Sequence, residues 1–365
     1  MVKNNPYRRS RLKAMAFTLI EMLCVVAVVG ILIAMLFPAV QAAREASRSV
    51  ACKASMRQLG IGLVSHESRF RRLPPGTLGA KSDWRVSLSD RANFEANPNS
   101  VYYLHNFQNT SWIAHVLPDL EMVSTYNRLP GVSVSTSQTY LEYLSTAGAG
   151  VPRHLVDDAE VLTASKLNIQ LLFCPSDHMR DEQQVKSLCG SQPAFINDYQ
   201  LDGFLYYSVD RDMAGTNYAA CSGASSGGFQ IDPEVQRFEG VFRSRSTTKL
   251  AEIQDGLSNT ICIGETLGEI SGGVRTSKNV WVFATMCRGR SDMLWMTTHS
   301  PRSPGLELIG DQWYNHQAGF GSKHSSGANF TFVDGSVQHI SRSVELRTFY
   351  RLCGRSDAEV AMDSP

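Results

Sequence analysis

Two residues in the last part of the chain have types and spacing that could support acid–base chemistry or metal binding. His324 is followed after nine residues by Asp334, in the segment GSKHSSGANFTFVDGSV. An imidazole and a carboxylate can exchange protons or share a metal ion. Asp334 also precedes Gly335 between two alternating apolar runs, a pattern that predicts a β-hairpin with a type I′ turn. We therefore interpret Asp334 and Gly335 as turn residues, and expect His324 to hydrogen-bond the hairpin without catalysis.

A Ser/Gly-rich segment is a second candidate for chemistry. Residues 223–227 read GASSG and match the Gly-x-Ser-x-Gly elbow of serine hydrolases, with Ser225 in the nucleophile position. That elbow requires a strand before the serine and a helix after it. The continuation GFQIDP at 228–233 is a poor helix start. A loop that matches by chance is the better interpretation.

The eight cysteines argue against a zinc site of the usual sequence pattern. The chain has no CxxC pair, and none of its nine histidines has HExxH spacing. Cys24 lies in an apolar segment and is interpreted as an apolar filler. Seven cysteines remain, so at least one is free or pairs between chains. Cys174 and Cys189 enclose a short loop and are the first choice for a disulfide.

The chain has an ordinary composition, but its N-terminal end is asymmetric in charge. The 365 residues are 43% hydrophobic and 19% charged, with a net charge of +1. These proportions exclude a disordered chain and a collagen-like repeat, and argue against a dedicated nucleic-acid binder. Five of the 35 basic residues lie before residue 17, where no acidic residue occurs, so 30 basic and 34 acidic residues remain in the rest.

The segment from Phe17 to Val40 is almost unbroken in its apolar character. As a helix it would span about 36 Å, enough to cross a hydrocarbon core of about 30 Å. The basic residues before it orient the start of the chain toward the cytoplasm and the rest outward. Glu21 is an ionisable residue within this segment. Because a buried carboxylate is costly in a bilayer, we expect it to have a cationic partner.

Three kinds of export signal fit this N-terminal pattern. A secretory signal peptide would be cut near Val40-Gln41-Ala42, although its apolar part would be long for that class. An uncut signal anchor would keep residues 1–16. A prepilin-type signal would be cut before Phe17, and the whole apolar helix would stay on the mature protein. The new α-amino group at Phe17 could then pair with Glu21 of a neighbouring subunit.

The prepilin alternative is favoured because Ala16-Phe17-Thr18-Leu19-Ile20-Glu21 resembles the prepilin cleavage and methylation motif. Pro38 also falls where type IV pilin-like helices have a kink-forming proline. Ala16 departs from the glycine that is usual before the cut. The resemblance implies cleavage between Ala16 and Phe17, methylation of Phe17, and an assembly or processing role for Glu21 and Pro38.

The sequence after the membrane segment predicts a helical stalk over residues 41–72. It is rich in alanine and charged residues, and Leu73-Pro74-Pro75-Gly76 ends it. Gly60 and Gly62 weaken the prediction of a continuous helix. One apolar stripe of this stalk is expected to pack on a globular head, and it comprises Val50, Met56, Leu59, Leu63 and Val64.

Residues 73–365 are expected to form an α+β head with an antiparallel sheet. Asp255-Gly256 predicts a turn before a strand that ends near Glu265. Further strands are expected at 217–220 and 278–285, and helices at 117–129, 155–169 and 344–353. The predicted organisation is therefore a leader (1–16), a membrane helix (17–40), a stalk (41–72) and a head (73–365).

The head also resembles the prepilin-type, processing-associated H-X9-DG family of unknown function. The resemblance rests on ordered landmarks: Leu73-Pro74-Pro75-Gly76, Ser111-Trp112 with Leu117-Pro118, Cys174-Pro175-Ser176-Asp177, Asn217-Tyr218, Asp255-Gly256 with Glu265, and His324 with Asp334-Gly335. It implies a localisation and a fold but no reaction and no cofactor. A calcium site built from loop aspartates such as Asp177 or Asp255 is left open, because some pseudopilins bind calcium.

Together these features predict a non-enzymatic, pilin-like or pseudopilin-like envelope protein. It would cross the inner membrane once, with its N-terminus in the cytoplasm and its head periplasmic or extracellular. The resemblance implies prepilin peptidase, membrane lipid, other pilin-like subunits and a type II secretion or type IV pilus assembly system as partners, and no nucleic acid. The alternative is an envelope hydrolase or glycan-binding receptor with a pocket near His324, Asp177 or Ser225.

Overall fold

The structure is a computed structural model of the 365-residue chain. It describes residues 19–78, 110–129, 159–179, 186–196, 199–209, 213–225, 238–243, 245–271, 274–282, 286–290, 295–296 and 320–356. The chain divides into two compact units, Met1–Ser47 and Arg48–Pro365, and each is described by itself.

A single helix, α1 (Leu19–Phe70), contains both the apolar segment and the predicted stalk. Its first part is exposed, and it is long and apolar enough to cross a membrane by length and composition. Pro38 lies inside the helix, and the helix continues through Gly60 and Gly62. The two glycines do not interrupt the helix, so the sequence analysis gave them too much weight.

The head packs on the last part of α1. Met56, Leu59 and Leu63 are buried, as the predicted stripe requires. Val50 and Val64 are exposed, so their place in that stripe was wrong. Gly60 and Gly62 are buried in the contact with the head instead, because the helix approaches the head most closely at these two glycines. A Cβ at Gly60 would lie 2.9 Å from Thr331 Cγ2, and one at Gly62 would lie 2.9 Å from Leu120 Cδ2.

A five-stranded sheet forms the centre of the head, in the order β11-β10-β4-β3-β7. Its strands are β3 (Tyr218–Ser225), β4 (Ile261–Glu265), β7 (Met286–Arg290), β10 (Gly327–Phe332) and β11 (Val337–Ser341). The pairs are antiparallel except β3 with β7, which is parallel. The expected α+β class with an antiparallel sheet is confirmed, with a parallel strand added at one edge.

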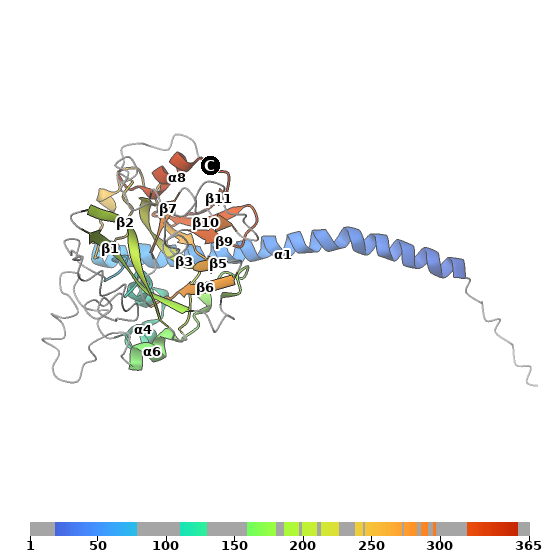
Figure 1. Cartoon of the computed structure of the whole chain (residues 1–365), viewed down its shortest axis with the longest axis horizontal. Coiled ribbons are helices and arrows are strands. Elements are labelled where there is room, and N and C mark those ends of the chain that lie inside the picture. The colour runs from blue at the N-terminus through green and yellow to red at the C-terminus, as the bar shows by residue number, and fades with distance from the viewer. Residues whose placement is uncertain are drawn as a thin grey trace, which may run out of the picture. The chain divides into compact units, whose positions relative to one another are not determined.

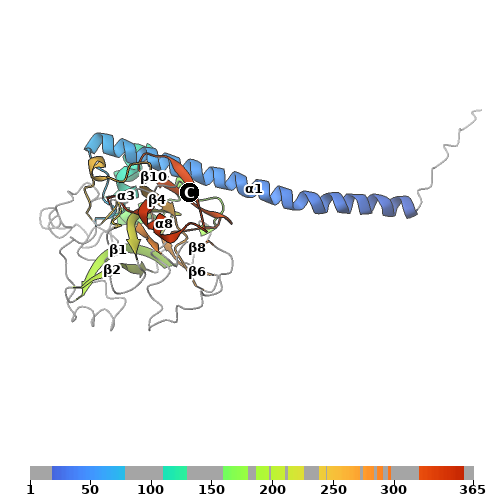
Figure 2. The same cartoon turned by 90° about the horizontal axis from the view of Figure 1, so that it is seen from above.

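The two faces of this sheet are covered by different helices. On one face, Met56 and Leu59 of α1 share a cluster with Tyr218, Ala220 and Cys262. On the other face lies the helix α8 (Leu346–Cys353) (Figure 2). Its Phe349 and Leu352 share a second cluster with Phe320, Phe330 and Phe332. Alternate residues of a strand point to opposite faces, and β4 and β10, whose residues are all buried, are therefore covered on both. A hydrogen bond of 3.3 Å from Thr331 Oγ1 to the Met56 carbonyl fixes α1 on the sheet.

Further strands lie outside the central sheet (Figure 1). A four-stranded sheet has the order β2-β1-β6-β5 and consists of β1 (Lys186–Ile196), β2 (Tyr199–Val209), β5 (Glu269–Ser271) and β6 (Val274–Asn279). Two short strands, β8 (Trp295–Met296) and β9 (Gly321–Ser322), pair in parallel. The strand expected over 278–285 was wrong in its extent, because β6 ends at Asn279 and Trp281 and Val282 form a turn. Residues 283–285 of that prediction lie outside the described residues.

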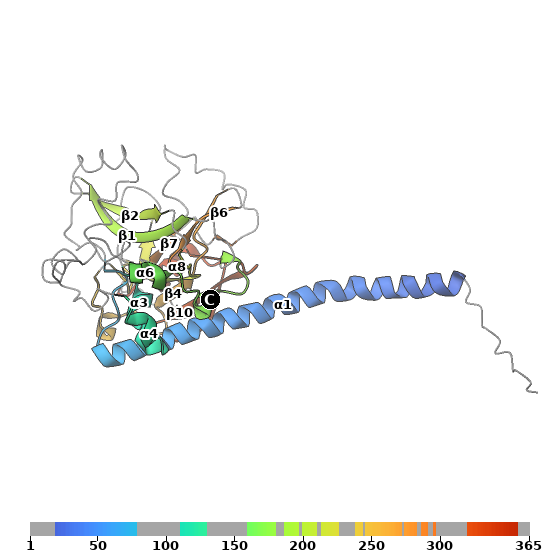
Figure 3. The same cartoon turned by 90° about the horizontal axis from the view of Figure 1, so that it is seen from below.

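Several short helices belong to the head, and those between Trp112 and Tyr126 lie beside the last part of α1 (Figure 3). The short helices are α3 (Trp112–Val116), η2 (Leu117–Leu120), α4 (Val123–Tyr126), α6 (Ala159–Ser165), η4 (Gln170–Leu172) and η6 (Leu250–Glu252). The one helix expected over 117–129 is broken at Glu121, which has a positive φ of 62°. Asp119 of η2 accepts hydrogen bonds from Ser65 (3.0 Å) and Arg69 (2.8 Å) of α1.

The Asp334-Gly335 pair does connect two antiparallel strands, β10 and β11. The predicted type I′ turn was wrong, however, because Gly335 has a positive φ (83°) and Asp334 does not. Gly335 N donates to Phe332 O (2.9 Å) and Phe332 N donates to Ser336 O (2.9 Å). This pattern is that of a three-residue loop, in which a type I turn is followed by a left-handed glycine. Asp334 Oδ1 accepts from Ser336 N (2.8 Å) and so stabilises the loop.

Candidate functional site

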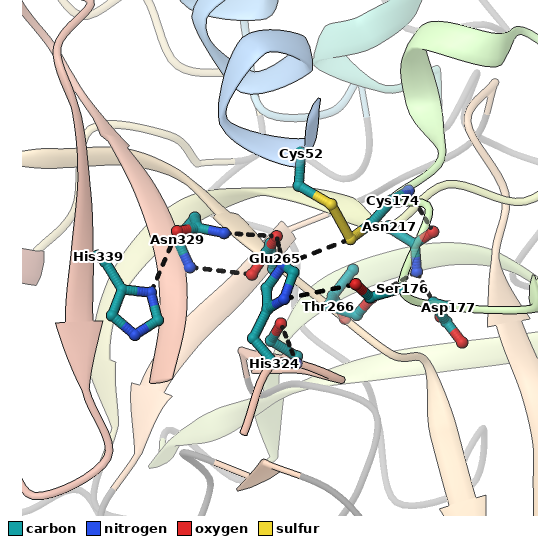
Figure 4. The surroundings of a disulfide bond; sticks show 11 residues. Cys52, Cys174, Ser176, Asp177, Asn217, Glu265, Thr266, His324, Asn329 and His339 are labelled. Carbon is teal, nitrogen blue, oxygen red and sulfur yellow. Dashed lines mark hydrogen bonds and ion pairs between the residues drawn. A yellow bond between two sulfur atoms is a disulfide. The ribbon is translucent and has the colours of Figure 1, made fainter. Parts of the chain in front are cut away.

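Four segments that are far apart in the sequence meet at one buried site (Figure 4). Cys52 comes from α1 and Cys174 from the segment that follows η4. Glu265 is the last residue of β4, and His324 follows β9. The four side chains are almost fully enclosed, with exposed fractions of 0%, 4%, 2% and 3% respectively.

Cys52 and Cys174 form a disulfide with a Cα–Cα distance of 5.0 Å. The predicted Cys174–Cys189 disulfide is therefore wrong. Sequence proximity suggested that pairing, but the packing of α1 on the head brings Cys52 to Cys174 instead. Among the cysteines whose side chains the structure describes, Cys24, Cys221, Cys262 and Cys353 form no disulfide. Burial raises the pKa of the Cys262 thiol, which keeps it protonated and unreactive.

His324 lies against the disulfide. Its Nε2 is 3.6 Å from Cys174 Sγ and 3.4 Å from Glu265 Oε1. Its other ring nitrogen, Nδ1, is 3.5 Å from Ser176 Oγ. Both nitrogens of the ring therefore face polar atoms, and the position of the ring is fixed from two sides.

Glu265 is held in place by a neighbouring strand. Its Oε2 accepts from the backbone N–H of Asn329 (2.9 Å), and its Oε1 accepts from Asn329 Nδ2 (3.1 Å). Asn329 Oδ1 in turn lies 3.1 Å from His339 Nδ1. Burial lowers the pKa of His339, which favours its neutral form. The result is a chain of polar contacts that runs from His339 through Asn329 to Glu265 and His324.

A second buried network holds the segment that carries Cys174. Both carboxylate oxygens of Asp177 accept from Arg275 Nη2 at 2.7 Å, and the two side chains are each 2% exposed. Asn217 Nδ2 donates to Asp177 Oδ2 (2.5 Å), and its Oδ1 accepts from Cys174 N (3.0 Å). The landmark residues Cys174, Asp177 and Asn217 are therefore parts of one arrangement that positions the disulfide.

The family of the chain follows from a comparison over most of its length. A family model described as a protein of unknown function, DUF1559, matches residues 41–347. The chain belongs to this DUF1559 family. No curated protein and no solved structure matches it. The DUF1559 match includes the last part of α1, all four residues of the buried site and the β10–β11 hairpin.

The structure gives the two ends of the H-X9-DG spacing different roles in this DUF1559 head. His324 contacts the disulfide, whereas Asp334 and Gly335 make the hairpin turn. Asp255 and Gly256 also form a turn, with a φ of 97° at Gly256, and Asn259 Nδ2 donates to the Asp255 carbonyl (3.2 Å). The turn and strand predicted at this point are confirmed, since β4 follows at Ile261.

The remaining sequence candidates lie in other elements, next to Cys174, or outside the described residues. Ser225 is the last residue of β3, and residues 226–237, where a hydrolase elbow would need a helix, are not among those described. Ala16 and Phe17 also lie outside the described residues. Glu21 is in the first turn of α1, and Pro38 is within the same helix. Pro175 and Ser176 follow Cys174 directly, beside His324.

Sequence reasoning missed three residues of this DUF1559 site: Cys52 as the disulfide partner, Arg275 and Asn329. Cys52 could have been noticed because it shares one face of the stalk helix with Met56, Leu59 and Leu63. Arg275 is 98 residues from Asp177, and no local pattern links the two. Asn329 lies inside an alternating strand, where its polar side chain among apolar residues was a usable signal.

Proposed function

We propose that the protein is a single-pass, membrane-anchored envelope protein of the pilin-like or pseudopilin-like class. DUF1559 membership with an N-terminal apolar helix is compatible with a membrane-anchored envelope protein. In the finer proposal, prepilin peptidase cuts between Ala16 and Phe17, and the helix remains in the inner membrane. The head is then periplasmic or extracellular, and other pilin-like subunits are its partners.

The observation that carries the proposal is the continuity of α1. One helix includes the exposed apolar segment and, further on, the buried residues Met56, Leu59 and Leu63. A secretory signal peptidase that cut near residue 42 would divide this helix. A cut before Phe17, or no cut at all, leaves it whole, so the helix argues against the secretory signal-peptide alternative.

The disulfide supports export of the head. Disulfides form and persist in oxidising compartments and are rare in the cytosol. Cys52–Cys174 closes a buried contact between α1 and the rest of the head. Placing the head outside the cytoplasm therefore agrees with both the basic residues before the helix and the disulfide.

We further propose that the head acts by binding or assembly rather than by catalysis. A hydrolase or receptor pocket at His324 or Asp177 would need these side chains at an open cleft. The exposed fractions of these side chains are 3% and 2%, and Asp177 is paired with Arg275. These observations support a structural role for the landmark residues.

The mass of the mature N-terminus tests the proposal. The full chain would be purified from membranes of two matched hosts, one with and one without a prepilin peptidase, and its intact mass measured. We expect a chain that starts at methylated Phe17 in the first host and at Met1 in the second. Ala16→Gly is the matched control and should give the same product. A start near Ala43 in both hosts, or an uncut chain in both, would contradict the proposal.

A further inference from the structure

The buried site has the composition of a metal centre as well as that of a disulfide. One ligand atom from each of Cys52, Cys174, Glu265 and His324 lies within 4.8 Å of all the others. Two sulfurs, one imidazole nitrogen and one carboxylate oxygen are a donor set that suits Zn²⁺. All four side chains are buried, which would protect a bound ion from competing ligands in solvent.

Two distances from His324 to other donor atoms agree with tetrahedral coordination. An ion with metal–sulfur and metal–nitrogen bonds of about 2.3 Å and 2.0 Å holds the sulfur and nitrogen about 3.5 Å apart at the tetrahedral angle. Cys174 Sγ and His324 Nε2 are 3.6 Å apart. For nitrogen and oxygen ligands the same geometry requires about 3.4 Å. His324 Nε2 and Glu265 Oε1 are 3.4 Å apart.

Residues around the four donors already hold them in orientation. Metal-binding histidines usually have a hydrogen-bond partner on the second ring nitrogen, and metal-binding carboxylates are usually hydrogen-bonded. Here His324 Nδ1 faces Ser176 Oγ (3.5 Å), and Glu265 accepts two hydrogen bonds from Asn329. The backbone of Cys174 is held by Asn217. The same contacts satisfy these buried polar groups when the disulfide is formed, so the site needs no new partners to bind an ion.

We propose that Cys52, Cys174, His324 and Glu265 form a Zn²⁺ site in the reduced protein, and that the disulfide is the alternative, oxidised state of the same site. A newly exported chain carries both cysteines as thiols. When Zn²⁺ binds, each thiol loses its proton to solvent and both sulfurs become ligands. The two sulfurs then separate to about 3.8 Å, which rotation about the two Cα–Cβ bonds must supply.

Oxidation forms the alternative state. A disulfide-bearing oxidoreductase accepts two electrons from the two cysteines, its own S–S bond opens to a dithiol, and the Cys52–Cys174 bond forms. Any bound Zn²⁺ is released in that step, because the thiolate ligands are consumed. Either state connects α1 to the segment after η4, so the helix stays attached to the head under both reducing and oxidising conditions.

Cobalt binding to the full chain tests the proposal. The protein, solubilised in detergent, would be reduced with a phosphine, freed of reductant without air, and titrated with Co²⁺. A tetrahedral site with thiolate ligands gives visible ligand-field bands and a near-ultraviolet sulfur-to-metal band. We expect one equivalent of Co²⁺, displaced by one equivalent of Zn²⁺, in the reduced protein and none in the oxidised protein.

Single variants identify the ligands. His324→Ala and Glu265→Gln should each raise the Kd for Co²⁺ by at least about tenfold, and Cys52→Ser should abolish the sulfur-to-metal band. Cys24→Ser is the matched control, because this cysteine is exposed and lies in the other compact unit. It should bind Co²⁺ as the wild type does. A folded, reduced wild type with two titratable thiols at this site and no bound Co²⁺ would overturn the proposal.

A protein that unfolds on reduction still gives a decisive result. Zn²⁺ added to the reduced chain should then restore the folded state, seen as a rise in Tm that is absent in His324→Ala. Failure of Zn²⁺ to bind and to refold the reduced wild type would overturn the proposal. The N-terminal mass measured for the proposed function does not depend on this result, so the two proposals can fail separately.

Discussion

Cys52 and Cys174 are joined by a disulfide, although 122 residues separate them in the chain. The bond connects the last part of α1 with the segment that also carries Asp177. A crosslink between distant residues restricts the unfolded chain strongly, because it closes a long loop in that state. The disulfide is therefore expected to stabilise the head as well as to hold α1 on it.

Removal of this disulfide should lower the stability of the head. Cys52→Ala should reduce the free energy of unfolding by about 2–4 kcal/mol. Urea unfolding, followed by the fluorescence of the buried Trp112 and Trp281, would measure the change in the presence of a metal chelator. Cys24→Ser, an exposed cysteine, should leave the midpoint unchanged. Equal midpoints for the two variants would contradict this role.

The buried ion pair between Asp177 and Arg275 gives a second prediction. Arg275→Ala leaves a buried carboxylate without its cation, and should cost about 3–5 kcal/mol in the free energy of unfolding. Arg243→Ala breaks an exposed ion pair with Glu239 and should cost about 0–1 kcal/mol. Urea midpoints of the two variants provide the comparison. A loss of only about 0–1 kcal/mol in both variants would contradict the prediction that the buried Asp177–Arg275 pair is important for stability.

Close packing of α1 on β10 predicts that Gly60 cannot be enlarged without cost. In Gly60→Ala the new Cβ would meet Thr331 Cγ2 at 2.9 Å and the Gly335 backbone at 3.4 Å. The overpacked contact should cost about 1–3 kcal/mol, more than the gain in helix propensity. Gly30→Ala is in the same helix and meets nothing within 4 Å. Stabilisation by Gly60→Ala would argue against this close contact.

The head should lose stability as the pH falls below 6.5. Burial, with smaller contributions from His66 and Arg72, lowers the pKa of His115 from 6.5 to about 3. Between these values the unfolded state binds a proton that the folded state does not, so stability present above pH 6.5 is lost on acidification. The slope from this residue approaches about 1.4 kcal/mol per pH unit.

His115→Gln tests this pH dependence. Because burial also lowers the pKa values of His66 and His339, the variant should remove only part of the slope. The measurement is the free energy of unfolding between pH 5 and 6.5 for wild type and variant. Parallel curves would exclude His115 as a source.

The charge of Glu21 provides the prediction for assembly. Glu21→Ala should be cut and inserted like the wild type but should assemble poorly, because the neighbouring Phe17 amine would lose its partner. Glu45→Ala, in the same helix beyond the apolar segment, is the matched control. Crosslinking between subunits in membranes, followed by gel analysis, would measure assembly. Unchanged crosslinking in Glu21→Ala would reject the pairing mechanism.

Local patterns predicted those parts of the fold that depend on neighbouring residues. The apolar run, the helix-breaking Leu73-Pro74-Pro75-Gly76, the Asp255-Gly256 turn and the C-terminal helix each rest on a short stretch of sequence. The confirmed helix α8 begins within two residues of its predicted start. The hairpin turn was placed correctly but given the wrong type, because the loop also includes Val333 and only Gly335 needs a positive φ.

The site itself depends on contacts that sequence spacing cannot show. His324, Glu265 and Cys174 were noticed as landmarks, yet nothing local indicated that Cys52 meets them. The argument against zinc used the absence of closely spaced ligands, whereas these four donors come from four separate segments. Val50 and Val64 illustrate the same limit, because an apolar residue on a helix does not reveal which face the head will cover.

The hydrogen bond from Thr331 to the Met56 carbonyl spans 275 residues, and it has a consequence for the order of biosynthesis. The surface that buries Met56, Leu59 and Gly60 includes β10, which is made near the end of translation. Until β10 is available, the buried stripe of α1 stays exposed, and such exposed apolar surface invites aggregation. Synthesis must therefore be close to complete before the head can fold, and a chain that stalls before residue 327 should become a substrate for proteases.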